Sequence, residues 1–186
     1  MRTETIERTV YTFGELSDKA KSAAISEYAT YSGWDDGTLD YCREVAISAG
    51  FCAPEIGYSG FCSQGDGACI VGTWYASDVR DDGEWGEEVR ALLAPFLAAP
   101  KGLSASLRHV GHYSHEHSVS VTFSWDADNI GDRDAVEEAT EKGMRDFMRW
   151  VYRTLEEEYE YLTSVDCFAE SCEANGWEFT EDGALA

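Results

Sequence analysis

Basic residues are scarce in this sequence. The 186 residues contain 14 Lys and Arg against 36 Asp and Glu, a formal net charge of −22. A nucleic-acid backbone or an anionic membrane is bound through positive groups, so this charge argues against direct contact with either. It permits three alternatives: simple solubility, binding of cations, and binding of a basic protein surface, including that of a nucleic-acid-binding partner.

Long apolar runs and enzyme motifs are also missing. No stretch approaches the length of a membrane span, and the N-terminal MRTETIERTV has no hydrophobic signal region. We therefore expect a cytoplasmic protein. There is no GxxxxGK[ST] phosphate loop, no GxGxxG opening a helix, no HExxH and no EF-hand. No enzyme class is indicated, and a binding protein is the stronger expectation.

Cysteine pairs with metal-binding spacing are absent as well. None of the six cysteines forms a CxxC pair, so we expect reduced thiols, with a Cys62–Cys69 disulfide across a hairpin as the alternative. The hydrophobic fraction of 44% and the aromatic fraction of 13% are sufficient for a packed core. We expect one domain over residues 1–186.

Hydrophobic periodicity predicts an α+β fold, with a mainly antiparallel sheet packed by helices that include one long C-terminal helix. Residues 119–125 alternate apolar side chains with Ser and Thr, which is typical of a half-buried antiparallel strand. Strands are predicted at 6–13, 56–62, 69–75, 103–110 and 115–127, with an edge strand at 177–180. Helices are predicted at 18–31, 39–49, 84–99, 134–162 and 165–174.

A glycine-rich segment joins two of the predicted strands. It contains the candidate ligand-binding residues Gln64, Gly65, Asp66 and Gly67. Glycine permits positive φ and close approach of the backbone to a ligand. An Asp-Gly pair is also an ordinary hairpin turn, so a purely structural role is the alternative.

All four histidines lie within residues 109–117. By strand alternation His115 and His117 share the inward face with Val119 and Val121, and His109 lies on the buried face of the preceding strand. We therefore expect His109, His115 and His117 to converge at the turn end of a hairpin. Three imidazoles with an acid can bind zinc or another divalent ion, can act in acid–base chemistry, or can form a structural hydrogen-bonded cluster. No cofactor is otherwise expected.

The long C-terminal helix carries a concentration of charge on the face opposite its apolar side. Arginines alternate there with acids, and acids crowd the C-terminal end, where they oppose the helix dipole. One interpretation is a solvent-exposed face with internal salt bridges, and the other is a partner-binding stripe. The candidate partner-binding residues are Arg145, Arg149, Arg153, Glu156 and Glu157.

Several stretches together resemble a family of small phage and prophage proteins often labelled "antitoxin of toxin–antitoxin stability system". The stretches are spread along most of the chain: YTFGELSDKAKSAAISEY, SGFCSQGDGACIVG, RHVGHYSHEHSVSV, RDFMRWVYRTLEEEYEYLTS and ANGWEFTEDG. The resemblance implies a phage setting and a host-cell cytoplasm, and it carries no mechanism from residue to residue. Small acidic proteins in that setting often inhibit host defence, CRISPR effectors included.

Two functional hypotheses follow. The first is a phage-type accessory protein that binds a basic or nucleic-acid-binding protein partner, inhibiting a host-defence component or neutralising a toxin. The second is a small-molecule, nucleotide or metal site, with a hydrolase as one form, built from the 64–67 loop and the histidines.

Overall fold

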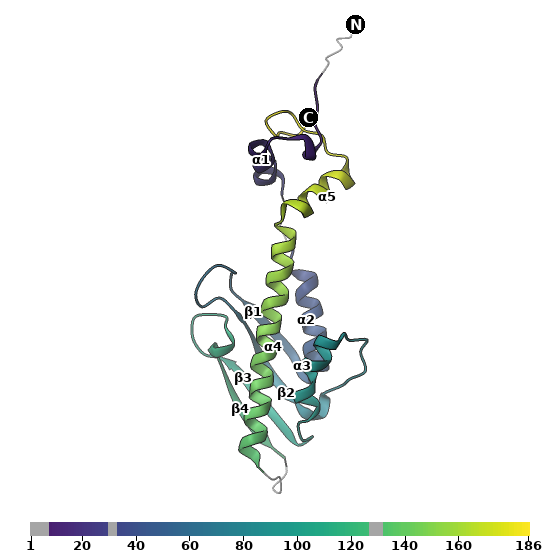
Figure 1. Ribbon diagram of the computed structural model, residues 1–186. Helices are drawn as coiled ribbons and strands as arrows, with labels where there is room; N and C mark the ends of the chain where they lie inside the picture. The colour runs from purple at the N-terminus through teal and green to yellow at the C-terminus, as the bar shows by residue number, and fades with distance from the viewer. Residues whose placement is uncertain (1–7, 30–32, 127–131) are drawn as a thin grey trace, which may run out of the picture. The chain divides into compact units, whose positions relative to one another are not determined.

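The computed structural model describes residues 8–29, 33–126 and 132–186 (Figure 1). By its internal contacts the chain groups into two compact units, and each is described separately below. One comprises Met1–Trp34 with Glu157–Ala186, and the other comprises Asp35–Glu156. This grouping does not test whether residues 1–186 fold as one domain, so that expectation stays a prediction.

The larger unit is built on a four-stranded antiparallel sheet with strand order β1-β2-β3-β4. Two predicted hairpins supply these strands, because each apolar alternation is followed by a loop and a second alternation. The α+β class, the antiparallel sheet and the long helix near the C-terminus are confirmed. The strands are β1 (Phe51–Tyr58), β2 (Ala68–Tyr75), β3 (Leu103–His109) and β4 (Val119–Trp125).

The two faces of the sheet differ in character. Trp74, Ala105 and Phe123 are neighbours across three strands on one face, where Trp74 is completely buried. Strand alternation places hydroxyl side chains on the other face. These are Thr73, Tyr75, Ser104, Ser106, Ser120, Thr122 and Ser124.

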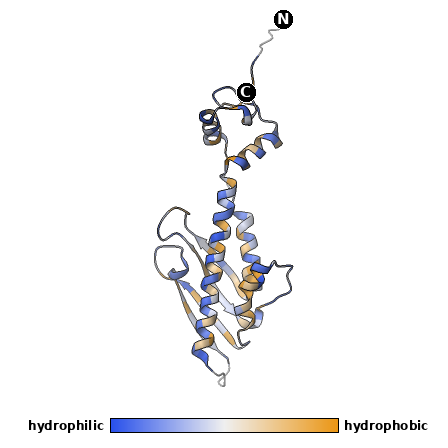
Figure 2. Ribbon diagram, viewed as in Figure 1, coloured by the Kyte–Doolittle hydropathy of each residue, from blue (hydrophilic) through white to orange (hydrophobic). Residues whose placement is uncertain are grey.

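Helices cover the apolar face. They are α2 (Asp36–Ser48), α3 (Glu87–Leu97) and α4 (Arg133–Leu162). Phe96 of α3 lies 5.9 Å from the Trp74 ring, and Phe147 of α4 lies 5.8 Å from the Phe51 ring. In α4, hydrophilic and hydrophobic residues interleave along the helix (Figure 2), because one side packs on the sheet and the other meets water.

The smaller unit has its own apolar core. It contains a short 3-10 helix (Phe13–Glu15), α1 (Asp18–Tyr28) and α5 (Val165–Asn175). Ser17 caps α1 by accepting a hydrogen bond from the Ala20 N–H, and Ser164 caps α5 in the same way. The buried residues are Phe13, Leu16, Ala20, Ala24, Phe168, Cys172 and Phe179.

Some predicted boundaries are wrong. The predicted strand at 115–127 starts too early, because residues 116–118 form a 3-10 helix and β4 begins at Val119. The helix predicted at 84–99 is shorter, because α3 spans Glu87–Leu97, with Pro95 in its last turn. Of the predicted strand at 6–13, residues 6 and 7 lie outside the described residues, and Tyr11 forms an isolated bridge with Phe179. In the described part of the chain, no helix is both long and apolar enough to cross a bilayer.

Candidate functional site

The glycine-rich loop between β1 and β2 is closed by its own hydrogen bonds. The Asp66 carboxylate accepts the backbone N–H groups of Cys62 at 2.8 Å and Ser63 at 2.6 Å. Ser59 accepts the Gly67 N–H through its hydroxyl, and its own N–H donates to the Gly67 carbonyl. Asp66 therefore holds the loop together, while Gln64 is exposed. Gly65 has a φ of +106°, a conformation that favours glycine.

The glycine loop and the histidine segment meet, as the second hypothesis requires. A Cβ atom added to Gly67 would lie 2.8 Å from His115 Cδ2, so the absence of a side chain at Gly67 allows this contact. The Ser59 hydroxyl donates to the Ser114 carbonyl at 3.4 Å. Because the backbone of one loop rests directly on the imidazole of the other, the contact is tightly packed.

His109 and His117 are exposed, so the predicted convergence of three histidines on the buried face is wrong. His109 is exposed, and a ring nitrogen lies 2.9 Å from the Tyr113 carbonyl. The His117 side chain is 68% exposed, whereas His115 is 28% exposed. For His117, the 3-10 turn at residues 116–118 interrupts the strand alternation, and a change of one residue in phase moves a side chain to the other face. His109 keeps its register opposite Val119 but is the last residue of β3, where the sheet no longer covers it.

Glu116, between two of these histidines, is the buried residue of the segment. Its carboxylate lies 3.0 Å from Arg149 Nε, 3.1 Å from His115 Nδ1 and 3.8 Å from His117 Nε2. The His115 and His117 rings stack at 5.3 Å. Arg145 donates to the Glu116 carbonyl, so two arginines of α4 hold this loop. The segment thus forms a cluster around Glu116, in which Arg149 is the ionic partner and two imidazoles lie close to the carboxylate.

A shared divalent metal site does not emerge from these positions. Over the ranges that the structure describes, no group of three His, Cys, Asp or Glu side chains is arranged to hold a metal ion. All six cysteines are free thiols, and Cys62 is exposed while Cys69 is buried. Burial raises the pKa of Cys42 to about 12, which keeps this thiol protonated.

The predicted partner-binding arginines take internal ionic partners. Arg145 pairs with Glu141, Arg149 with Glu116 and Asp146, and Arg153 with Glu88 of α3. These contacts favour the interpretation of an internally salt-bridged face. Glu156 is half-buried in the larger unit, and Glu157 is exposed in the smaller one.

Beside these arginines lies a groove of about 380 Å³ between α3 and α4. Its apolar part is formed by Ala91, Leu92, Pro95, Gly143 and Trp150, and its charged part by Glu88, Asp146, Arg149 and Arg153. Both charge signs are present in close pairs, so the groove has no strong preference for an anion or a cation.

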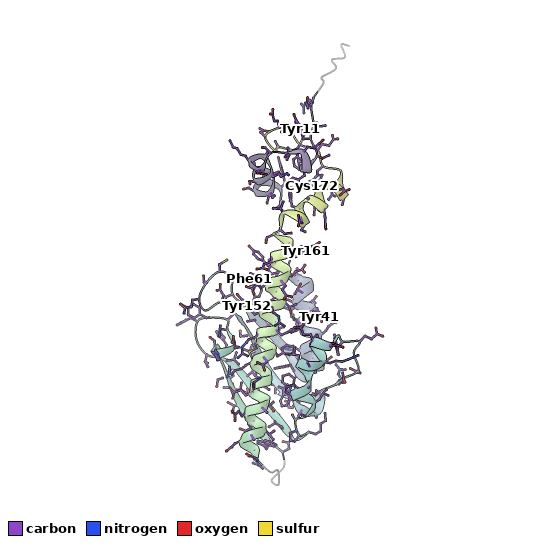
Figure 3. All side chains as sticks on the ribbon, viewed as in Figure 1. Tyr11, Tyr41, Phe61, Tyr152, Tyr161 and Cys172 are labelled. Atoms are coloured by element: carbon purple, nitrogen blue, oxygen red, sulfur yellow. The ribbon has the colours of Figure 1, made fainter. Side chains whose placement is uncertain are left out.

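Aromatic side chains join the glycine loop to α4. Phe61, which is labelled together with Tyr152 in Figure 3, has its ring 5.5 Å from the Tyr152 ring and 5.9 Å from the Tyr58 ring. The Tyr152 hydroxyl donates to the Gly60 carbonyl at 3.3 Å. Tyr58 donates to Asp35 at 2.8 Å, and burial together with this bond raises the pKa of Tyr58 to about 12. These contacts hold the loop in place.

An acidic surface on α2 and residues 78–88 is the feature that sequence reasoning did not locate. Helical spacing places Asp36, Asp40 and Glu44 in one row. Of the acids on this surface, only Asp40, through Arg43, and Glu88, through Arg153, form ion pairs with other described residues. The exposed carboxylates of this acidic surface are Asp36, Asp40, Glu44, Asp78, Asp81, Asp82, Glu84, Glu87 and Glu88.

Tyr41 adds an aromatic side chain to the acidic surface (Figure 3). It is 41% exposed and lies 6.4 Å from the Trp85 ring and 5.8 Å from the Trp150 ring. Burial, with a smaller effect of the nearby Glu88 carboxylate, raises the pKa of Tyr41. The contact with Trp85 brings α2 and the 78–88 segment together. Only the run of acids at 78–88 could have indicated this surface beforehand.

Comparison with known proteins identifies a family whose function is unknown. A family model described as "Domain of unknown function (DUF8835)" matches residues 34–165. This range includes the whole larger unit, with its sheet, the glycine loop, the histidine segment and the acidic surface. No curated protein and no protein of known structure shows a significant match to the chain.

Proposed function

Since the chain belongs to the DUF8835 family, whose description assigns no activity, we propose that it acts by binding a basic protein partner through the acidic surface. The observation that carries this proposal is the row of exposed carboxylates on α2 beside those of residues 78–88. Most of them have no cationic partner within the described residues. Such a field attracts a cationic surface and accelerates its association.

The aromatic residues at the acidic surface supply contacts that charge alone lacks. Tyr41 and Trp85 offer ring surface to an arginine or lysine of the partner, which binds over an aromatic face while pairing with a carboxylate. Aromatic anchors within a polar rim are the usual arrangement of energetically important interface residues. The partner's matching surface is therefore rich in arginine and lysine.

A nucleic-acid-binding protein has this chemistry, because its own binding surface is positive. In a phage setting, which the sequence resemblance suggests, the chain would inhibit a host-defence component or neutralise a toxin by covering that surface. Direct binding of nucleic acid is not part of the proposal, since the net charge of −22 opposes it.

Variants with matched charge test this proposal. One replaces three acids of α2, as Asp36→Asn, Asp40→Asn and Glu44→Gln, and the other replaces three exposed acids of the smaller unit, as Asp166→Asn, Glu173→Gln and Glu178→Gln. Both lose the same net charge. A partner is first captured from host lysate at low salt and identified, and its Kd is then measured with purified proteins.

The α2 variant is expected to weaken binding at least tenfold, whereas the smaller-unit variant changes the Kd less than about threefold. Binding should also weaken steeply as salt rises, because exposed charges are screened. Equal losses in both variants would show that only overall charge matters. Failure to retain any partner at low salt would reject binding through the acidic surface.

A second candidate function is a small-molecule, nucleotide or metal site at the glycine loop. It is favoured by the contact of Gly67 with His115 and by the exposure of Gln64 beside it. Metal analysis of the purified protein and a thermal-shift screen with Zn²⁺ and nucleotides test it. A ligand that raises the melting temperature of the wild-type protein but not that of Gln64→Ala would support this candidate. If neither Zn²⁺ nor any nucleotide stabilises the wild-type protein, the result would count against it.

A further inference from the structure

The two edges of the sheet differ in how they oppose further strand pairing. In β1, Pro54 cannot donate a backbone hydrogen bond, Glu55 carries a charge, and the register shifts between Cys52 and Glu55. Ala53, inside this irregular stretch, has a φ of +44°. Proline, charge and a bulge are the features that protect an edge strand from pairing with another chain. The β1 edge is therefore blocked.

The β4 edge carries none of these features. Its sequence from Val119 to Trp125, VSVTFSW, has no charged residue and no proline. Its pairing with β3 runs without a register shift from His109↔Val119 to Leu103↔Trp125. A straight, uncharged strand at the edge of a sheet is a template for another strand.

The hydrogen bonds beyond the ends of the β3–β4 pairing show which backbone groups of β4 point outward. Val110 N–H donates to the Ser118 carbonyl at 2.7 Å, and Asp126 N–H donates to the Gly102 carbonyl at 2.9 Å. In an antiparallel pair the bonded residues alternate, so the even-numbered residues of β4 face β3. The backbone groups of Val121 and Phe123 face away from the sheet.

These outward groups lack partners among the described residues. No hydrogen bond from that part of the chain, backbone or side chain, reaches the N–H or the C=O of Val121 or Phe123. At the neighbouring position, Arg145 donates to the Val119 carbonyl at 3.3 Å. The unoccupied part of the edge is thus the centre and the C-terminal end of β4.

We propose that β4 pairs with β4 of a second copy of this chain, antiparallel about a two-fold axis at Thr122, and so joins two sheets into one. Under this symmetry Val121 of one copy lies opposite Phe123 of the other, and each pair exchanges both N–H···O=C bonds. Because the two-fold relates these outward residues to each other, a second copy supplies hydrogen-bond partners for the backbone N–H and C=O groups of Val121 and Phe123.

The charges close to this edge do not oppose a second copy in spite of the net charge of −22 on each chain. Because β4 contains no acidic residue, the proposed pairing places no strand carboxylate opposite another. On α4, Arg145 contacts the Val119 end of the strand, and Glu137 accepts the Trp125 indole N–H at 2.6 Å at the other end. Glu141 pairs with Arg145 at the Val119 end, and the Arg133 guanidinium lies over the Trp125 ring at the other end. The two-fold places the Val119 end of one copy beside the Trp125 end of the other, so both charge signs are present on each side of the interface.

Sedimentation velocity over a concentration series tests this pairing. The wild-type chain is expected to reach twice its 20.6 kDa mass at high protein concentration and moderate salt. Thr122→Lys places two like charges at the two-fold, where cross-strand side chains are directly opposite, and should raise the dimer Kd at least about fivefold. This variant also lowers the net negative charge, so overall repulsion alone predicts the opposite change.

Two matched variants distinguish edge pairing from other contacts. Thr122→Val keeps the strand uncharged and should leave the dimer Kd within about twofold. Ser106→Lys places the same charge on the hydroxyl face of β3, opposite Thr122 in the pairing of the two strands but not at the edge. It should have no effect on edge pairing, and a dimer disrupted by Ser106→Lys to the same extent would overturn the proposal in favour of face-to-face stacking.

A cross-link provides an independent measurement. In a Cys52→Ser, Cys62→Ser background, which removes the exposed thiols, Thr122→Cys should form an intermolecular disulfide under mild oxidation. Ser120→Cys, two residues away, should not, because it lies opposite residue 124 of the other copy. A wild-type chain that stays monomeric at all concentrations would overturn the proposal. The proposal would also be overturned if the monomer bound a different protein and this binding were lost in Thr122→Lys, since a strand of that protein would then occupy the edge.

Discussion

Replacing Glu116 by Gln tests whether its carboxylate holds the histidine segment on α4. The Glu116 side chain is only 10% exposed, and Arg149, which it contacts at 3.0 Å, is 51% exposed. An exposed ion pair contributes about 0–1 kcal/mol, and removing one partner of a buried pair costs about 3–5 kcal/mol. Because one partner is buried and the other is half-exposed, we expect a loss of about 2 kcal/mol.

Urea unfolding followed by tryptophan fluorescence measures this loss, and a double-mutant cycle with Arg149→Met isolates the pair. The coupling between the two substitutions should be about 1–2 kcal/mol. Asp40→Asn, which removes an exposed carboxylate paired with Arg43, is the control and should cost less than about 0.5 kcal/mol. A coupling below about 0.3 kcal/mol would refute the assignment of Glu116 as the centre of the cluster.

Two further predictions concern the glycine loop and the thiols. Gly67→Ala should lower the free energy of unfolding by about 1–3 kcal/mol, because the added Cβ would lie 2.8 Å from the His115 imidazole. Gly14→Ala is the control, and it should have little effect in the same assay because the space around Gly14 is open. In thiol labelling of the native protein, the exposed Cys52 and Cys62 should react promptly and the buried Cys42 only upon unfolding. Since the pKa of Cys42 is raised from 9.0 to about 12 in the folded chain, folding favours the protonated thiol. The protonated Cys42 thiol therefore contributes fully to stability below about pH 9, and this contribution is lost as pH rises towards 12. Labelling of Cys42 in the native protein as fast as that of Cys62 at about pH 8 would contradict its burial.

The candidate site was only partly predictable from sequence. The glycine loop and the histidine segment each stand out by composition, and they do contact one another through Gly67 and His115. Their meeting depends on the pairing of four strands, which places the β1–β2 loop beside the β3–β4 loop. The importance of Glu116 was hidden, because an acid between two histidines in an acidic chain has no distinguishing pattern.

The arginine stripe of α4 shows the same limit. Its helical spacing is visible in the sequence, and so are both interpretations of it. The choice between an internal salt-bridged face and a partner-binding face depended on where Glu88 and Glu116 lie, and both are far from α4 in the sequence. The acidic surface likewise needed the contact of Tyr41 with Trp85, two residues that are far apart in the sequence.

Sequence by itself determined the number and type of most helices and strands, the antiparallel pairing of the hairpins and the acidic character of the surface. These follow from local periodicity, turn residues and composition, which act between near neighbours. Tertiary structure decided that Glu116 is buried where histidines were expected, that the arginines of α4 pair internally, and that β4 offers an open edge while β1 does not. Those features depend on strand phase, on a one-turn 3-10 helix and on contacts between distant segments, where a shift of one residue reverses the face that a side chain occupies.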